Sequence, residues 1–223
     1  MRDVYKTIGG YGADEIIINK SRFIGHGVPI NSEEEALQFI DIISTKHRDA
    51  THNVYAYVLG EESNIQRFSD DGEPSGTAGI PVLEVIKKED LRNVLVVVTR
   101  YFGGIKLGGG GLIRAYTKGA KIAVDAGKVV DMTLHQRLEI KIPYTLYGKM
   151  ENFLMSNGYT LEDVEFETEV KIYLYVVKAT VGDFTNEITN LTNGNLEIKY
   201  DYEKHLPLVN GQRYLNDKLS IDS

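Results

Sequence analysis

Residues 94 to 127 read VLVVVTRYFGGIKLGGGGLIRAYTKGAKIAVDAG, which combines an aliphatic run, two glycine clusters and a helical pattern. The run from Val94 to Val98 does not alternate with polar residues, so it predicts a strand buried on both faces. The glycines at 103–104 and 108–111 predict a loop. Apolar residues then recur at helical spacing from Leu112 to about Ala126. The stretch therefore predicts a strand, a glycine-rich loop and a helix in succession.

The junction of this loop and helix is a candidate anion site. A helix N-terminus presents backbone N–H groups without intrahelical partners and a partial positive charge. Four consecutive glycines, Gly108 to Gly111, cost roughly 0.5–1 kcal/mol each relative to alanine when they become ordered. An ordinary loop does not need them. We therefore expect left-handed backbone positions or a close approach of the backbone to a ligand.

Positive charge is concentrated in the same part of the chain. Seven basic residues and one acidic residue lie between Arg92 and Lys128, although the whole chain has a net charge of −7. Arg114 and Lys118 are four residues apart and share a helix face. The alternative interpretation is the solvated face of an amphipathic helix. The candidate anion- or RNA-binding residues are Arg100, Lys106, Gly108, Gly109, Gly110, Gly111, Arg114 and Lys118.

The glycines do not match the common nucleotide-binding loops. No Lys-Ser or Lys-Thr follows them, as a Walker loop requires, and the third glycine of a dinucleotide fingerprint is missing. We therefore expect no cofactor. The chain contains no cysteine. His47 and His52 have no third ligand nearby in the sequence, so we also expect no metal site.

A group of carboxylates precedes this stretch, at Asp70, Asp71 and Glu73. Such residues can serve as general acids or bases, or as cation ligands. The alternative is turn chemistry, in which aspartate accepts local N–H bonds and Gly72 supplies a positive φ angle. We favour the turn, and we expect Thr77 to cap a following helix that runs to about Lys88.

Two motifs resemble the IMPACT/YigZ family: RFSDDGEPSGTAG at 67–79 and TRYFGGIKLGGGGLIRAY at 99–116. The resemblance implies an α+β protein of two domains. The first, at 1–131, would have the ribosomal protein S5 domain 2-like fold. The second, at 132–208, would be ferredoxin-like and similar to the last domain of elongation factor G. Independently of the resemblance, the polar composition after Leu208 predicts a loose tail at 209–223. Eukaryotic members of the family restrain an amino-acid-starvation response by binding a ribosome-associated activator of an initiation-factor kinase.

The apolar periodicity of the second half independently predicts the order βαββαβ. Leu138, Ile140 and Ile142 alternate with charged residues, as in a half-buried strand. From Leu134 to Ser223 there are nine basic and fourteen acidic residues. This half is therefore not expected to bind a phosphate backbone.

Two functions fit these observations. The first is a translation-linked binding module that engages RNA, a phosphate-bearing ligand or a ribosome-associated protein. The second is a small hydrolase or transferase that uses the helix N-terminus as an anion site and Asp70, Asp71 or Glu73 as a base. Because no G-x-S-x-G motif and no Ser-His-Asp spacing is present, binding is favoured. No apolar signal region or membrane-length run occurs, so we expect a cytoplasmic protein without membrane contact.

Overall fold

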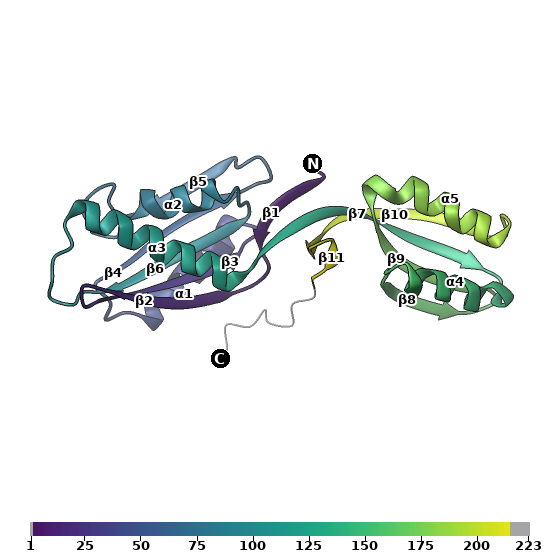
Figure 1. Cartoon of the computed structure of the whole chain (residues 1–223), viewed down its shortest axis with the longest axis horizontal. Helices are drawn as coiled ribbons and strands as arrows, with labels where there is room; N and C mark the ends of the chain where they lie inside the picture. Colours follow the sequence, from purple (N-terminus) through teal and green to yellow (C-terminus); the bar gives the residue numbers. More distant parts are fainter. Residues whose placement is uncertain (1, 215–223) are drawn as a thin grey trace. The chain divides into compact units, whose positions relative to one another are not determined.

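The computed structural model describes residues 2–214 of the chain (Figure 1). Its internal contacts divide the chain into two compact units. Unit 1 runs to Met132 and resumes at Pro207, and unit 2 is Thr133–Leu206. The sequence prediction placed residues 132–208 in the second domain. The structure differs in returning the chain to unit 1 at Pro207.

Unit 1 contains a five-stranded antiparallel sheet in the order β2-β3-β6-β4-β5. Its elements are β1 (Val4–Ile8), β2 (Gly12–Ile18), β3 (Ser21–Pro29), α1 (Glu33–Lys46), β4 (His52–Leu59), β5 (Ile65–Ser69), α2 (Gly79–Lys88), β6 (Val94–Tyr101) and α3 (Gly109–Gly127). Strand β1 lies outside this sheet and pairs with β7 (Val129–Ile142).

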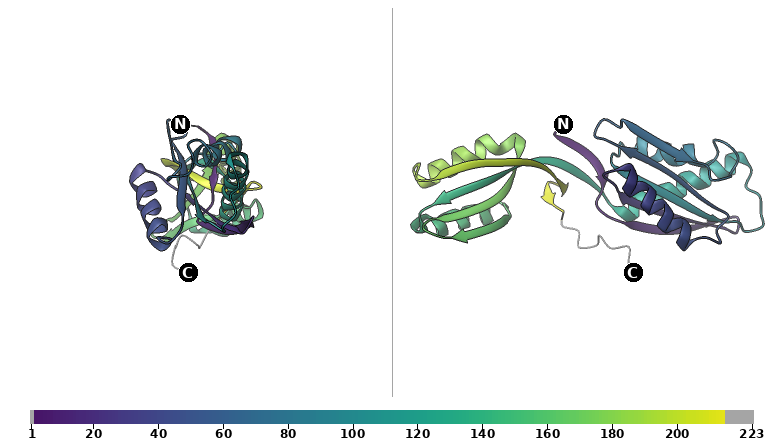
Figure 2. Two further views of the ribbon diagram at one scale, coloured as in Figure 1. Left: turned by 90° about the vertical axis from the view of Figure 1, so that its left-hand side faces the viewer. Right: turned by 180° about the vertical axis from the view of Figure 1, so that it is seen from behind.

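Helices cover both faces of the sheet in unit 1. Helices α2 and α3 lie on the face seen in Figure 1, and α1 lies on the opposite face, seen from behind in Figure 2. The central strand β6 contributes Val96 and Val98 to the core under α2 and α3, and Leu95 and Val97 to the core under α1. The aliphatic run is therefore buried on both faces, as predicted.

Helix boundaries show two differences from the predictions. Helix α3 begins at Gly109, three residues before the predicted start at Leu112. The three glycines of its first turn are poor helix formers, so the prediction left them in the loop. Thr77 does not cap α2. Its hydroxyl donates to the carbonyl of Pro74, and the N-cap position is Ala78, which makes no side-chain cap bond.

Unit 2 is built from β7, α4 (Tyr144–Ser156), β8 (Leu161–Phe166), β9 (Val170–Val177), a short 3-10 turn (Lys178–Thr180), α5 (Val181–Thr192) and β10 (Glu197–Val209). Its strands lie in the order β10-β7-β9-β8. This is the ferredoxin-like arrangement, and it confirms the predicted βαββαβ order. One core includes Leu138 and Ile140 of β7, Ile172 and Leu174 of β9, and Phe184 of α5.

The predicted polar tail at 209–223 is only partly within the described residues. Strand β10 continues to Val209 and pairs with β11 (Gln212–Arg213), so this part of the tail forms an ordered hairpin instead of a loose segment. Residues 215–223 lie outside the described part of the chain. Among residues 2–214, no helix is both long enough and apolar enough to span a membrane.

Candidate anion-binding surface

The glycine-rich loop follows β6 and is fixed against the turn between β2 and β3. Gly103 packs so closely on this turn that a Cβ there would overlap the Lys20 carbonyl, and its N–H donates to the Ser21 hydroxyl. Gly104 and Gly108 have φ angles of 84° and 69°. These glycines therefore meet local steric requirements of the loop.

The next glycines have a different environment. A Cβ at Gly109 would meet only Thr77 Cγ2, at 3.9 Å, and one at Gly110 would meet only Arg114 Nη1, also at 3.9 Å. Gly108 is the N-cap of α3 and provides no side-chain cap bond. The first turn of α3 thus presents backbone N–H groups without a capping side chain or a covering Cβ, which is the geometry that favours an anion.

Three predicted basic side chains surround this turn. Lys106, Arg114 and Lys118 are exposed. Within residues 2–214, no carboxylate lies within salt-bridge distance of any of them, whereas Lys121 one turn further pairs with Glu89 at 2.8 Å. Their charges are therefore available to a ligand.

Arg100 does not belong to this exposed set. The residue is 5% exposed, and its guanidinium donates to Glu73 Oε1. It also lies between the rings of Phe23 and Phe102, 5.5 Å from each ring centroid. Arg100 was predicted to contact an anionic partner, but in the structure burial and the pairing with Glu73 keep its charge away from the surface.

Sequence reasoning missed two features beside the helix. The β2–β3 turn brings the backbone of Lys20, an exposed basic residue, against the loop at Gly103. A cavity of about 140 Å³ then lies between this turn and α3, lined by Asn19, Leu107 and Arg114 among others. The sequence signal was Asn19-Lys20, a polar pair between two strands, but its packing on residue 103 is not a local property. The basic surface consists of Lys20, Lys106, residues 108–111, Arg114 and Lys118.

The candidate catalytic carboxylates have structural partners. Asp70 Oδ1 accepts hydrogen bonds from the N–H groups of Ala78 and Gly79, at 3.1 and 2.8 Å, and so caps α2. Asp71 has a φ angle of 44°, and its side chain accepts from the N–H of Asn53. These are the contacts expected of turn and capping residues.

Glu73 is 8% exposed and is the acceptor at the centre of a buried polar group. The hydroxyl of Tyr116 donates at 2.7 Å to Glu73 Oε1, the same oxygen that accepts from Arg100. His52 Nε2 lies 3.8 Å from the same oxygen. Burial and the hydrogen bond to this carboxylate raise the pKa of Tyr116. Glu73 therefore neutralises a buried guanidinium and does not face the basic surface as a free base.

Metal binding finds no support in the arrangement of side chains. Over the described range 2–214, no group of three or more His, Asp or Glu side chains is placed to hold an ion. His52, one of the two histidines considered above, uses its Nδ1 atom in a 2.6 Å hydrogen bond with the Asp71 carbonyl.

The fold and this surface define a class: a two-domain α+β protein with a basic, glycine-rich loop and helix in its first domain. Residues 19–124 match the Impact N-terminal domain. Residues 140–195 match a domain of unknown function, DUF1949. The two matches fall within units 1 and 2 respectively.

Whole-chain relatives share both domains. IMPACT family member YvyE of Bacillus subtilis is 46% identical over 195 residues, which are 87% of this chain and 90% of that protein. IMPACT family member YigZ of Escherichia coli is 31% identical over 183 residues, which are 81% and 90% of the two chains. The chain therefore belongs to the IMPACT family, which confirms the resemblance seen in the two motifs. A crystal structure of a hypothetical protein has 27% identity and a TM-score of 0.58, and the match covers 91% of this chain and 99% of that one.

Proposed function

We propose that this protein acts in translation control as a regulatory binding protein that docks its basic surface on RNA, or on an anionic partner associated with the ribosome. The translation context comes from membership of the IMPACT family, whose eukaryotic members act on a ribosome-associated activator. The observation that carries the proposal is the set of exposed cations Lys106, Arg114 and Lys118, which have no carboxylate partner among residues 2–214, beside an uncapped helix N-terminus.

The hydrolase or transferase alternative has no comparable support. The oxygens of Asp70 and Glu73 described above accept hydrogen bonds from α2 and from Arg100 and Tyr116. A general base must instead be within reach of the proton that it abstracts from a substrate. The binding function is therefore the one that the contacts of these residues favour.

Salt dependence tests the proposal quantitatively. Contacts between cations and phosphates release counterions, and for single-stranded RNA the slope of log K against log salt is roughly −0.7 per contact. With Arg100 buried and Lys20 added, the basic surface has four cations, so we expect a slope of about −3 for a single-stranded or looped RNA. A salt-independent association with RNA or ribosomes would contradict the proposal.

A charge reversal locates the surface. Arg114→Glu with Lys118→Glu should abolish RNA binding without unfolding the chain, because both side chains face solvent. The matched control is Lys46→Glu with Arg48→Glu, which changes the charge equally at the end of α1, on the opposite face of the sheet. If both double variants lose binding equally, the protein's overall charge is responsible and the basic surface is not the site.

A further inference from the structure

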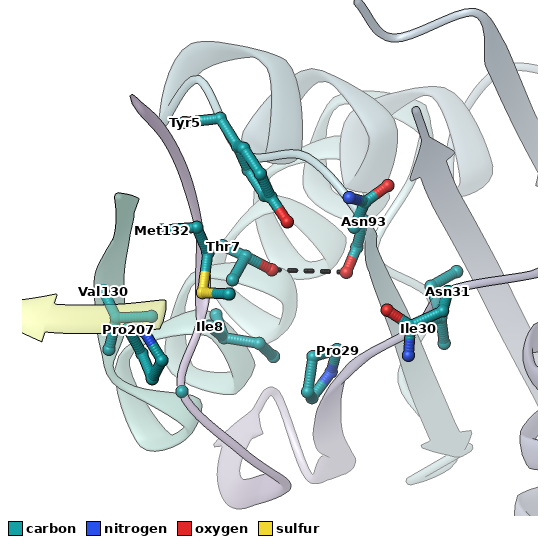
Figure 3. A pocket seen from close by; sticks show the side chains of 11 residues that line it. Tyr5, Thr7, Ile8, Pro29, Ile30, Asn31, Asn93, Val130, Met132 and Pro207 are labelled. Atoms are coloured by element: carbon teal, nitrogen blue, oxygen red, sulfur yellow. Dashed lines mark hydrogen bonds between the residues drawn. The ribbon is translucent and has the colours of Figure 1, made fainter. Parts of the chain in front are cut away.

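Unit 1 contains a second cavity, of about 150 Å³, which the proposed function does not use (Figure 3). Its lining includes Gly9, whose N–H donates to the carbonyl of Gly127 at the end of α3. The basic surface lies at the start of the same helix. A helix of 19 residues is roughly 28 Å long at 1.5 Å per residue, so the two sites are separate.

One wall of the cavity is polar and is held firmly in place. The carbonyl oxygen of Asn93 accepts from the N–H of Ile30 at 2.9 Å and from the hydroxyl of Thr7 at 3.2 Å. The Asn93 side chain accepts from the N–H of Gly60 at 2.8 Å, which fixes this residue at a φ angle of 51°. Having donated its proton, the Thr7 hydroxyl keeps lone pairs with which it can accept a hydrogen bond from a ligand.

The rest of the lining carries no charged side chain, and its side chains are apolar apart from those of Tyr5 and Asn31. Ile8, Val130, Met132 and Pro207 form the wall opposite Asn93, and the ring of Tyr5 reaches in from β1 (Figure 3). A charged ligand would lose its hydration here without gaining a partner. An apolar cavity of about 150 Å³ is large enough to admit one benzene ring.

We infer that this cavity is a binding site for a small uncharged molecule with one apolar ring and one hydrogen-bond donor, such as a phenol. The ring contacts the apolar wall, and the donor reaches the Thr7 hydroxyl. Small-molecule sites are typically apolar cavities with a few placed polar groups, and this lining has that composition.

The cavity is lined by the residues at which the chain leaves and re-enters unit 1, so a bound ligand should affect these two segments. Met132 is the last residue before the chain leaves unit 1, and Pro207 is the first after it returns. Both line the cavity. A bound ring would therefore contact unit 1 at both points where the chain crosses its boundary, and amide exchange at residues 130–132, 208 and 209 should slow when the ligand binds.

The test uses phenol, toluene and benzoate as probes of the full chain, followed by amide NMR. Phenol should cause saturable shifts at residues 7–9, 130–132 and 208. Toluene should bind about fivefold more weakly, since it lacks the donor, and benzoate should not bind. If phenol at millimolar concentration causes no saturable shift at these residues, or if benzoate binds as well as phenol, the inference is wrong.

Thr7→Val keeps the shape of the side chain and removes the acceptor. The affinity for phenol should therefore fall to that for toluene, and the affinity for toluene should not change. Thr7→Ser keeps the hydroxyl and should retain the preference for phenol. The matched control is Thr192→Val in unit 2, a buried threonine that also donates to a backbone carbonyl, that of Ile188 at 2.8 Å. A preference for phenol that survives in Thr7→Val would overturn the assignment of Thr7 as acceptor.

Discussion

The basic surface of unit 1 and the sheet of unit 2 differ in whether their basic side chains have carboxylate partners. In unit 1, Lys106, Arg114 and Lys118 are exposed and have no carboxylate within 4.0 Å among the residues described. In unit 2, Arg137 on β7 pairs with Glu162 at 2.7 Å and also with Asp201.

The same pattern continues across the face of the unit 2 sheet that α4 and α5 do not cover. Lys141 pairs with Glu139 and Glu197, and Lys199 pairs with Glu139 and Asp201. These cations already have partners, so a phosphate would have to compete with a carboxylate. The comparison shows that local pairing, and not the count of basic residues, decides which surface is open to an anion.

Buried and exposed ion pairs give the sharpest contrast between the units. Glu73→Ala should destabilise unit 1 by about 3–5 kcal/mol, because it leaves the Arg100 guanidinium buried without a counter-charge. Glu197→Ala in unit 2 should change stability by about 1 kcal/mol or less, because that side chain is 68% exposed. Urea unfolding of both variants measures the difference. Equal effects would mean that Arg100 finds another partner or water when Glu73 is removed.

Between pH 7 and pH 4.5, unit 1 should lose stability as the pH falls. Burial, together with the smaller effects of the nearby positive charges of His47 and Lys46, lowers the pKa of His26 from 6.5 to about 4. The folded state therefore favours neutral His26. Its contribution is fully present above pH 6.5 and is lost as the pH falls from there toward 4, by about 3 kcal/mol at roughly 1.4 kcal/mol per unit.

Hydrogen exchange of β3 and α1 amides between pH 7 and pH 4.5, corrected for intrinsic rates, measures this loss. His26→Gln cannot gain a proton, so its stability should vary less over the same range. An unchanged pH dependence in that variant would assign the effect to other groups.

The smallest predicted effect comes from giving the basic surface a partner of the kind found in unit 2. Thr117→Glu places an exposed carboxylate three residues from Arg114, a spacing at which helix side chains interact. We expect it to weaken RNA binding at low salt and to reduce the magnitude of the salt slope by roughly 0.7, the value of one phosphate contact.

The matched control is Thr189→Glu in unit 2. Like Thr117, Thr189 is exposed on a helix and donates its hydroxyl to the carbonyl four residues earlier. Fluorescence anisotropy with a labelled RNA across a salt series compares the two. If Thr189→Glu has the same effect as Thr117→Glu, the added carboxylate acts through net charge and not through the basic surface.

The sequence alone predicted those structural elements that depend on a local pattern of residues. The aliphatic run predicted β6, the spacing of apolar residues predicted α3, and alternation in the second half predicted the ferredoxin-like order. The burial of Arg100 was missed although a signal was present. A period of two places Arg100 on the same face as Val96 and Val98, which belong to the core under α2 and α3. The partner of Arg100, Glu73, is 27 residues away in the sequence, so local spacing does not reveal that the buried charge is neutralised.

Other parts of the site depend on contacts that no local pattern contains. The packing of Gly103 against the Lys20 backbone joins two turns that are 83 residues apart, and the cavity beside Arg114 is lined by residues of both β2 and α3. The pocket of Figure 3 is likewise formed by four strands and by Asn93, each from a different part of the chain. Composition and spacing specify the elements, but these surfaces arise only when the elements pack.

The capping of the first two helices has a consequence for the order in which unit 1 folds. The N-terminus of α1 is capped by Ser32, whose hydroxyl accepts from the N–H of Glu35, so this turn can form from neighbouring residues alone. Helix α2 depends on Asp70, and the intervening loop must close before that cap exists. In pulse-labelled refolding we therefore expect amides of α1 to gain protection before those of α2, and replacing Asp70 with Ala should delay α2 without delaying α1.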